Sequence, residues 1–105
     1  MDGQTSIAYL QNYIRSKDHH PEQIKDYFLK LSGEVGELAE AIRHGLTRPA
    51  DGGVKGTVDE EIWDCMYYLI AIANCYGIDL EKTICEKEAI NNVKYNTGIE
   101  FEQNR

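Results

Sequence analysis

The chain has 105 residues, a formal net charge of −7 and three cysteines, which suits one small domain that gains stability from oligomerisation. The net negative charge argues against a protein that binds nucleic acid or a membrane surface, since such proteins carry a basic surface patch. The N-terminus lacks a signal-peptide apolar region, and no apolar run reaches the roughly 18 residues of a membrane span. We therefore expect a single cytoplasmic domain over residues 1–105.

The first two predicted elements are helices. Apolar residues at helical spacing predict a short helix over about residues 5–16. Pro21 fits the first turn of a long second helix, because its missing amide hydrogen has no helical partner there. Apolar positions at helical spacing continue to Ile42, and Gly45 is expected to end this helix.

A glycine- and proline-containing segment, residues 45–56, is expected to form a surface loop. Thr57 and Glu60 then have the spacing of a capping box, which opens a third helix. This helix is expected to end before Gly77.

The fourth predicted helix begins after Asp79, a good N-cap residue, and runs to about Tyr95. From Gly98 onward the sequence is typical of a frayed polar tail. The sequence contains no alternation of strand period, so the expected fold class is all-α.

Two carboxylate pairs are the candidate functional residues. Glu34 and Glu37 lie three apart on the second helix, and Glu61 and Asp64 lie three apart on the third. Residues at that spacing share a helix face, so two facing helices would bring four carboxylates together. A set of oxygen ligands without thiolate or imidazole indicates Mg²⁺ or Mn²⁺.

The alternative for each acid is an ordinary solvated position on a helix surface. Against it, the helical wheel places the first pair beside the apolar Leu38. A di-iron carboxylate bundle would need Glu-x-x-His on two helices, and that spacing is absent from the chain.

These segments resemble the MazG-like nucleotide pyrophosphohydrolases, also called all-α NTP pyrophosphatases. Residues 31–42, LSGEVGELAEAI, are similar to the family's first acidic motif, and residues 61–74, EIWDCMYYLIAIAN, to its second. Residues 77–80, GIDL, precede a counterpart of the family's last motif. That counterpart consists of Lys87, Asn91, Lys94 and Tyr95.

The resemblance implies a four-helix MazG-like bundle that hydrolyses a nucleoside triphosphate, with Mg²⁺, to a monophosphate and pyrophosphate. Glu34, Glu37, Glu61 and Asp64 would hold the metal. The physical chemistry agrees, because phosphoryl transfer needs charge neutralisation and positioning more than a covalent nucleophile.

The resemblance also implies substrate-binding residues on the fourth helix. Lys87, Asn91 and Lys94 fall on one helical stripe that can meet the phosphates, with an ordinary polar face as the alternative. Tyr95 is expected to stack on the nucleotide or to pack at the helix end. Trp63 is expected to stack on a base or to belong to the core.

Two positions depart from the family pattern. Gly33 stands where many members have a glutamate, a form similar to the dCTP pyrophosphatase branch. Lys94 replaces the usual arginine, which keeps the positive charge but loses the bidentate geometry.

The charge-free stretch from residue 65 to residue 73 is expected to lie at a subunit contact. A helix that is apolar all round must be covered all round, either by a second subunit or by its own neighbouring helices. We expect a homodimer or homotetramer, as the resemblance implies, with Tyr68 and Ala71 facing outward.

The competing functional hypothesis is a non-catalytic acidic module that binds a partner protein or stores metal. Such a module would tolerate Glu37→Ala. The three cysteines lack zinc-site spacing, and Cys65 and Cys75 are expected to be reduced core residues.

Overall fold

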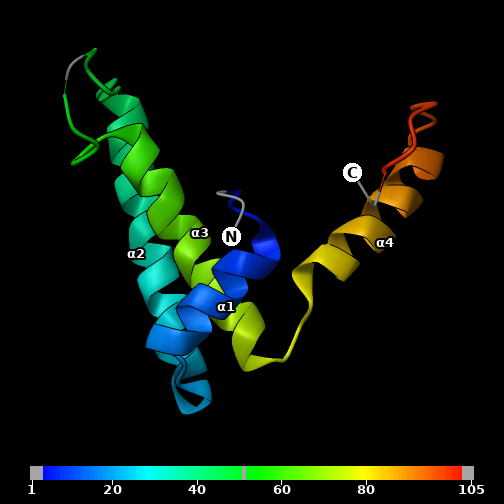
Figure 1. The fold of residues 1–105 in the computed structure, drawn as a ribbon. Helices are drawn as coiled ribbons and strands as arrows, with labels where there is room; N and C mark the ends of the chain where they lie inside the picture. Colours follow the sequence, from blue (N-terminus) through cyan, green and yellow to red (C-terminus); the bar gives the residue numbers. More distant parts are fainter. Residues whose placement is uncertain (1–3, 51, 103–105) are drawn as a thin grey trace.

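The computed structural model describes residues 4–50 and 52–102, and over these ranges the chain is helical without strands. Its elements are α1 (Ile7–Lys17), a 3-10 turn (Pro21–Gln23), α2 (Ile24–Arg43), α3 (Val58–Cys75) and α4 (Leu80–Lys94) (Figure 1). The expected all-α class is confirmed. Asp51 of the predicted loop and residues 103–105 of the predicted tail lie outside the described residues.

The helix starts follow the capping signals. The hydroxyl of Ser6 accepts a hydrogen bond from the Tyr9 amide, at 3.0 Å, so α1 begins at Ile7 rather than at residue 5. Pro21 opens a 3-10 turn instead of the first α-helical turn, and α2 begins only at Ile24.

Glycines end both long helices, as expected. Gly45 and Gly77 have φ of 62° and 66°, a left-handed conformation that glycine adopts without a Cβ clash. After α3, the amide of Ile78 donates to the carbonyl of Ala73 at 3.0 Å. This bond is the signature of a Schellman motif.

The antiparallel helices α2 and α3 make the most extensive contact between helices in the structure (Figure 1). The side chain of Thr57 accepts from the Glu60 amide at 3.3 Å, and the Glu60 carboxylate accepts from the Gly56 amide at 2.8 Å. The amide of Val58 also donates to the carbonyl of Leu46 at 2.9 Å. The first two bonds cap α3, and the third joins its start to the residues that follow α2.

The core lies where α1 and α2 both contact α3. Ile14 of α1 is fully buried, and Tyr27 of α2 packs with Ile70 and Ala71 of α3. The stretch from residue 65 to residue 73 is therefore covered in part by its own chain.

The expectation that Tyr68 and Ala71 face outward is wrong. Ala71 is only 1% exposed, and Tyr68 packs against the core. The physical reason is that α1 and α2 cover two sides of α3. Leu69 and Met66 are the members of this stretch that remain exposed.

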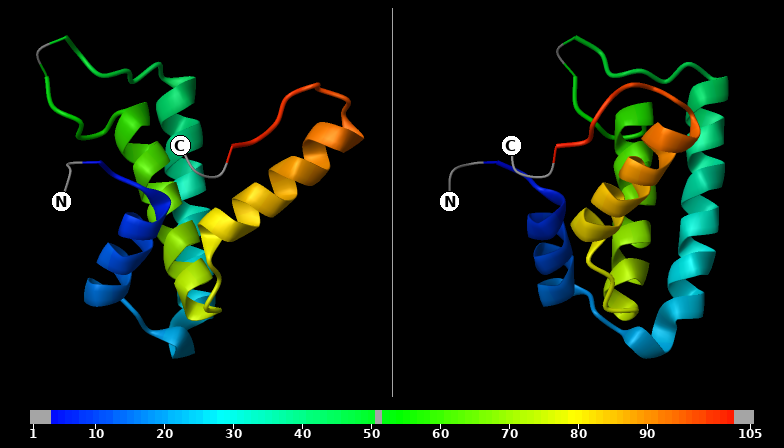
Figure 2. Two further views of the ribbon diagram at one scale, coloured as in Figure 1. Left: turned by 45° about the vertical axis from the view of Figure 1, so that its right-hand side comes forward. Right: turned by 90° about the vertical axis from the view of Figure 1, so that its right-hand side faces the viewer.

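The fourth helix is not packed into a compact bundle. It diverges from α2 and α3 and makes its main contacts with α1 (Figures 1 and 2). None of its residues is buried. The fold is therefore a three-helix core with one outlying helix.

A carboxylate at the end of α1 joins the three core helices. The hydroxyl groups of Tyr27 and Tyr67 donate to the two oxygens of Asp18, at 2.7 and 2.8 Å. The Tyr27 bond is the main cause that lowers the pKa of Asp18, while burial raises the pKa of Tyr27 to about 12.

Replacing Tyr67 with phenylalanine is expected to cost about 1–2 kcal/mol of unfolding free energy at pH 7, because a hydrogen bond to a carboxylate is lost. Since the pKa of Asp18 is lowered in the folded state, its stabilising contribution is present above its unfolded pKa and is lost as the pH falls through the folded pKa. Urea unfolding should therefore show a smaller difference at pH 2.5 than at pH 7. An equal difference at both values would contradict this account.

Candidate metal and phosphate site

The two acidic motifs meet where α2 and α3 pack together. Glu34 lies near the middle of α2, Glu61 in the first turn of α3, and Asp64 almost one turn later. One carboxylate oxygen from each of these three residues lies within 4.8 Å of the others. Three of the four predicted ligands therefore converge across the helix pair.

The environment of Glu61 is unusual for a carboxylate. Glu61 is 8% exposed, and its buried Oε2 atom has no hydrogen-bond partner. Burial is the main cause that raises the pKa of Glu61, and the charge of Asp64 raises it further. An ionised carboxylate in such a place is costly unless a positive charge neutralises it.

Glu34 is half-buried beside the same acids. Burial raises its pKa, followed by the charges of Asp64 and Glu61. Repulsion within the group and the unpartnered oxygen both favour a bound cation, because a cation would stabilise all the ionised forms at once. An all-carboxylate donor set suits a hard divalent ion.

Glu37 lies at the edge of the cluster. It is exposed and does not belong to the group of three converging oxygens. Its negative charge nevertheless contributes to the raised pKa values of Glu34 and Glu61. Its assignment as a metal ligand stays a prediction.

The structure places Trp63 mainly with the core. It is partly buried, packs against the core cluster, and its ring meets that of Tyr67 edge-on, with the centroids 6.1 Å apart. Its alternative assignment to base stacking also stays a prediction.

The predicted substrate-binding residues lie on the outlying helix. The Asn91 side chain donates to Glu88 at 3.1 Å, and the Lys94 ammonium lies 5.3 Å from the centre of the Tyr95 ring. Because α4 diverges from α2 and α3, this single chain does not gather the α4 residues around the acids (Figure 2). The predicted substrate-binding residues, which therefore lie apart from the acids of the same chain, are Lys87, Asn91, Lys94 and Tyr95.

Cys65, which the sequence predicts to be a core residue, lies beside the acids. The pKa of Cys65 is raised by burial and then by the charges of Glu34, Glu61 and Asp64. This thiol therefore borders the acidic cluster. The signal was available in the sequence, since Cys65 follows Glu61 by four residues and so shares its helix face.

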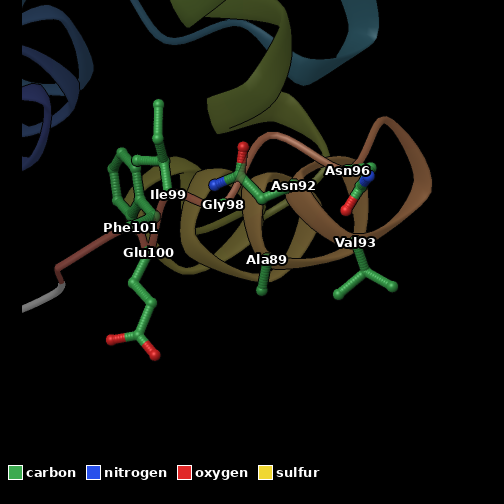
Figure 3. A pocket seen from close by; sticks show the side chains of 8 residues that line it. All are labelled: Ala89, Asn92, Val93, Asn96, Gly98, Ile99, Glu100 and Phe101. Atoms are coloured by element: carbon green, nitrogen blue, oxygen red, sulfur yellow. The ribbon is translucent and has the colours of Figure 1, made fainter.

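A hollow of about 680 Å³ lies away from the acids, between α4 and the chain that follows it. Figure 3 shows Ile99 and Phe101, from the segment that follows α4, on one side of the helix. The lining residues are Ala89, Asn92, Val93, Asn96, Gly98, Ile99, Glu100 and Phe101. None of them is a candidate ligand for the metal.

The helices of the described ranges are too short or too polar to cross a membrane.

The helices α2 and α3, with three carboxylates converging between them, define an all-α protein with a candidate cation site. The family model for the MazG nucleotide pyrophosphohydrolase domain matches residues 22–91. The chain therefore belongs to the MazG nucleotide pyrophosphohydrolase family, and the resemblance noted from the sequence is confirmed.

Two crystal structures of iMazG from Vibrio DAT 722 are similar to this chain. The C-terminally tagged form is 45% identical, with a TM-score of 0.78, and the match covers 84% of this chain and 99% of that one. The N-terminally tagged form is 47% identical, with a TM-score of 0.79, and the match covers 88% and 99%. No curated protein matches the chain.

Proposed function

We propose that this chain is a Mg²⁺-dependent nucleoside triphosphate pyrophosphohydrolase and that its 105 residues form one MazG-like domain. The observation that carries the proposal is the convergence of Glu34, Glu61 and Asp64, together with a buried oxygen of Glu61 that has no hydrogen-bond partner. The family membership supports the same reaction class.

In this mechanism Glu34, Glu37, Glu61 and Asp64 would hold the metal. When bound, Mg²⁺ or Mn²⁺ neutralises phosphate charge and polarises the α-phosphate. One of the four carboxylates accepts a proton from the attacking water. The water oxygen bonds to the α-phosphorus, the bond to the bridging oxygen breaks, and pyrophosphate leaves.

The cations of α4 supply the remaining charge. The triphosphate carries several negative charges, and the protein itself has a net charge of −7. Lys87 and Lys94, with Asn91 between them, lie on one stripe of α4 and would bind the phosphates. Tyr95 would contact the nucleoside at the end of that stripe.

Because α4 diverges from the acids of its own chain, we place the complete site in a homo-oligomer, a dimer or tetramer. Phe28, Val35 and Ile42 recur every seven residues on α2, and all three are more than half exposed. Ile62, Leu69 and Tyr76 recur at the same spacing from α3 to its C-cap and are also exposed. We call these six residues the apolar face.

The apolar face is continuous at one end, since Phe28 and Tyr76 line the same hollow of about 460 Å³. Exposed apolar patches of this kind mark association surfaces. A second copy on this face would cover it and would bring another α4 toward the acids.

Hydrolysis in the presence of Mg²⁺ is expected to yield the monophosphate and pyrophosphate from a panel of nucleoside triphosphates. In ¹⁸O-labelled water the label should enter the monophosphate, because water attacks the α-phosphorus. Ion chromatography with mass spectrometry measures both outcomes. Label in pyrophosphate, or release of orthophosphate by a pure preparation, would reject the proposed bond cleavage. Metal binding without turnover would favour the non-catalytic alternative.

A further inference from the structure

Two buried amide side chains lie outside the candidate site. Gln11 of α1 is 5% exposed and Asn74 of α3 is 4% exposed. The Gln11 amide nitrogen donates to the Asn74 side-chain oxygen at 3.0 Å, and the Asn74 amide nitrogen donates to the Gln11 backbone carbonyl at 2.9 Å. The two side chains therefore join α1 to the last turn of α3.

The same glutamine also binds the corner between α3 and α4. Its amide nitrogen donates to the carbonyl of Ile78 at 2.8 Å, and its oxygen accepts from the Leu80 amide at 3.1 Å. Leu80 is the first residue of α4. We call the two amide side chains of Gln11 and Asn74, with these bonds, the corner clamp.

Further polar contacts surround the corner clamp. Arg15 of α1 donates to the Asn74 side-chain oxygen at 3.0 Å. The carboxylate of Glu81, in the first turn of α4, accepts from the Ala8 amide at 2.8 Å. Leu80 packs against the core cluster, but no residue of α4 is buried, so these hydrogen bonds add to limited apolar packing in holding the start of the helix.

A buried polar network of this kind specifies one geometry when its groups are satisfied. Apolar residues of similar size would fill the same space without selecting a direction for α4. We propose that the corner clamp is a positioning device that sets the direction of α4, and hence where its phosphate-binding stripe reaches. The proposal rests on the proposed function, because it assigns a purpose to that stripe.

Gln11→Met tests the clamp, because methionine keeps the length of the side chain and removes its hydrogen bonds. KM for the nucleotide is expected to rise on the order of tenfold with kcat within about twofold, since misplaced phosphate contacts weaken binding in the ground and transition states alike. The Mn²⁺ affinity of the free enzyme should not change. Ile14→Val is the matched control, because it loosens the fully buried contact of α1 and should leave KM unchanged.

A double-mutant cycle separates positioning from general destabilisation. If the clamp acts through α4, Gln11→Met should add little to the rise in KM caused by Asn91→Ala. Independent, multiplicative effects would overturn the proposal. A fall in kcat with unchanged KM would overturn it equally.

The direction of α4 has a readout that does not need turnover. Spin labels at Asp59→Cys on α3 and Glu86→Cys on α4, in a chain whose native cysteines are replaced by alanine, report their separation by pulsed EPR. Excess unlabelled chain keeps the signal intramolecular. Gln11→Met should broaden or shift the distance distribution, and an unchanged distribution would overturn the clamp. Absence of turnover in the wild type would reject the proposed function instead, and the EPR measurement would still decide on the clamp.

Discussion

Replacing Glu61 with glutamine is expected to lower kcat/KM by about 10³-fold or more, the scale on which single charge-stabilising groups act in phosphoryl transfer. Glu61 is the most buried of the four acids, and its Oε2 atom has no protein partner. A neutral amide fills the same space but is a far weaker ligand for a hard cation. Steady-state kinetics with saturating Mg²⁺ measures the loss.

The same variant should be more stable than the wild type in a metal-free solution at pH 7. Burial and neighbouring carboxylates raise the pKa values of Glu34 and Glu61. Because these pKa values are higher in the folded state than in the unfolded state, the folded state binds more protons. Its stability therefore falls as the pH rises through the folded pKa values. Metal-free wild type should therefore be more stable at pH 5 than at pH 7, and Glu61→Gln should reduce the difference.

Glu40→Gln is the control for both measurements. Glu40 follows Glu37 by three residues, but it is exposed and its carboxylate pairs with Arg43 at 3.0 Å. Its replacement should leave turnover and the pH slope nearly unchanged. A Glu61→Gln enzyme with wild-type activity would remove this carboxylate from the mechanism.

The second large effect is expected from Leu69→Glu. Leu69 is 54% exposed and is the middle one of the three positions that α3 and its C-cap contribute to the apolar face. A glutamate there would bury its charge when two copies associate. The proposed oligomer should dissociate, and activity should fall by at least tenfold because in the proposed shared site the acids would lose the second copy's α4. Analytical ultracentrifugation and turnover at one protein concentration measure both effects.

Ser16→Glu is the matched control, since it adds the same charge at an exposed position of α1 outside the apolar face. It should leave assembly and activity unchanged. Ala71→Glu is unsuitable as a test of assembly, because Ala71 is buried in its own chain and the substitution would disrupt the core. A wild type that sediments as a monomer with full turnover would refute the shared site.

The sequence predicted the helices well because their signals are local. Thr57 and Asp79 cap the helices that follow them, as predicted, through bonds that span three residues, and Ser6 caps α1 in the same way although no cap was predicted there. Gly77 ends its helix for the same local reason, a backbone conformation that other residues adopt at a cost. At Pro21 the local signal was correct for a helix entry but did not separate a 3-10 turn from an α-helical one.

The acid pairs were also visible in the sequence, because their spacing of three residues depends only on helix geometry. Which acids converge was not visible. The convergence of Glu34 with Glu61 and Asp64, and the more exposed place of Glu37, depend on how α2 and α3 pack together. The place of Cys65 beside Glu61 was visible from their spacing of four residues, but its nearness to Glu34 depends on the packing of the two helices.

By itself the sequence determined the all-α class, the glycine-terminated ends of the two long helices and the presence of the two acidic pairs, since each depends on residues close together along the chain. The tertiary structure decided the burial of Ala71, the unpartnered oxygen of Glu61 and the outward course of α4. These features depend on contacts between residues far apart in the chain. Gln11 and Asn74, 63 residues apart, are the strongest example. Nothing in the sequence next to either residue indicates that their side chains bind each other at the junction of α3 and α4.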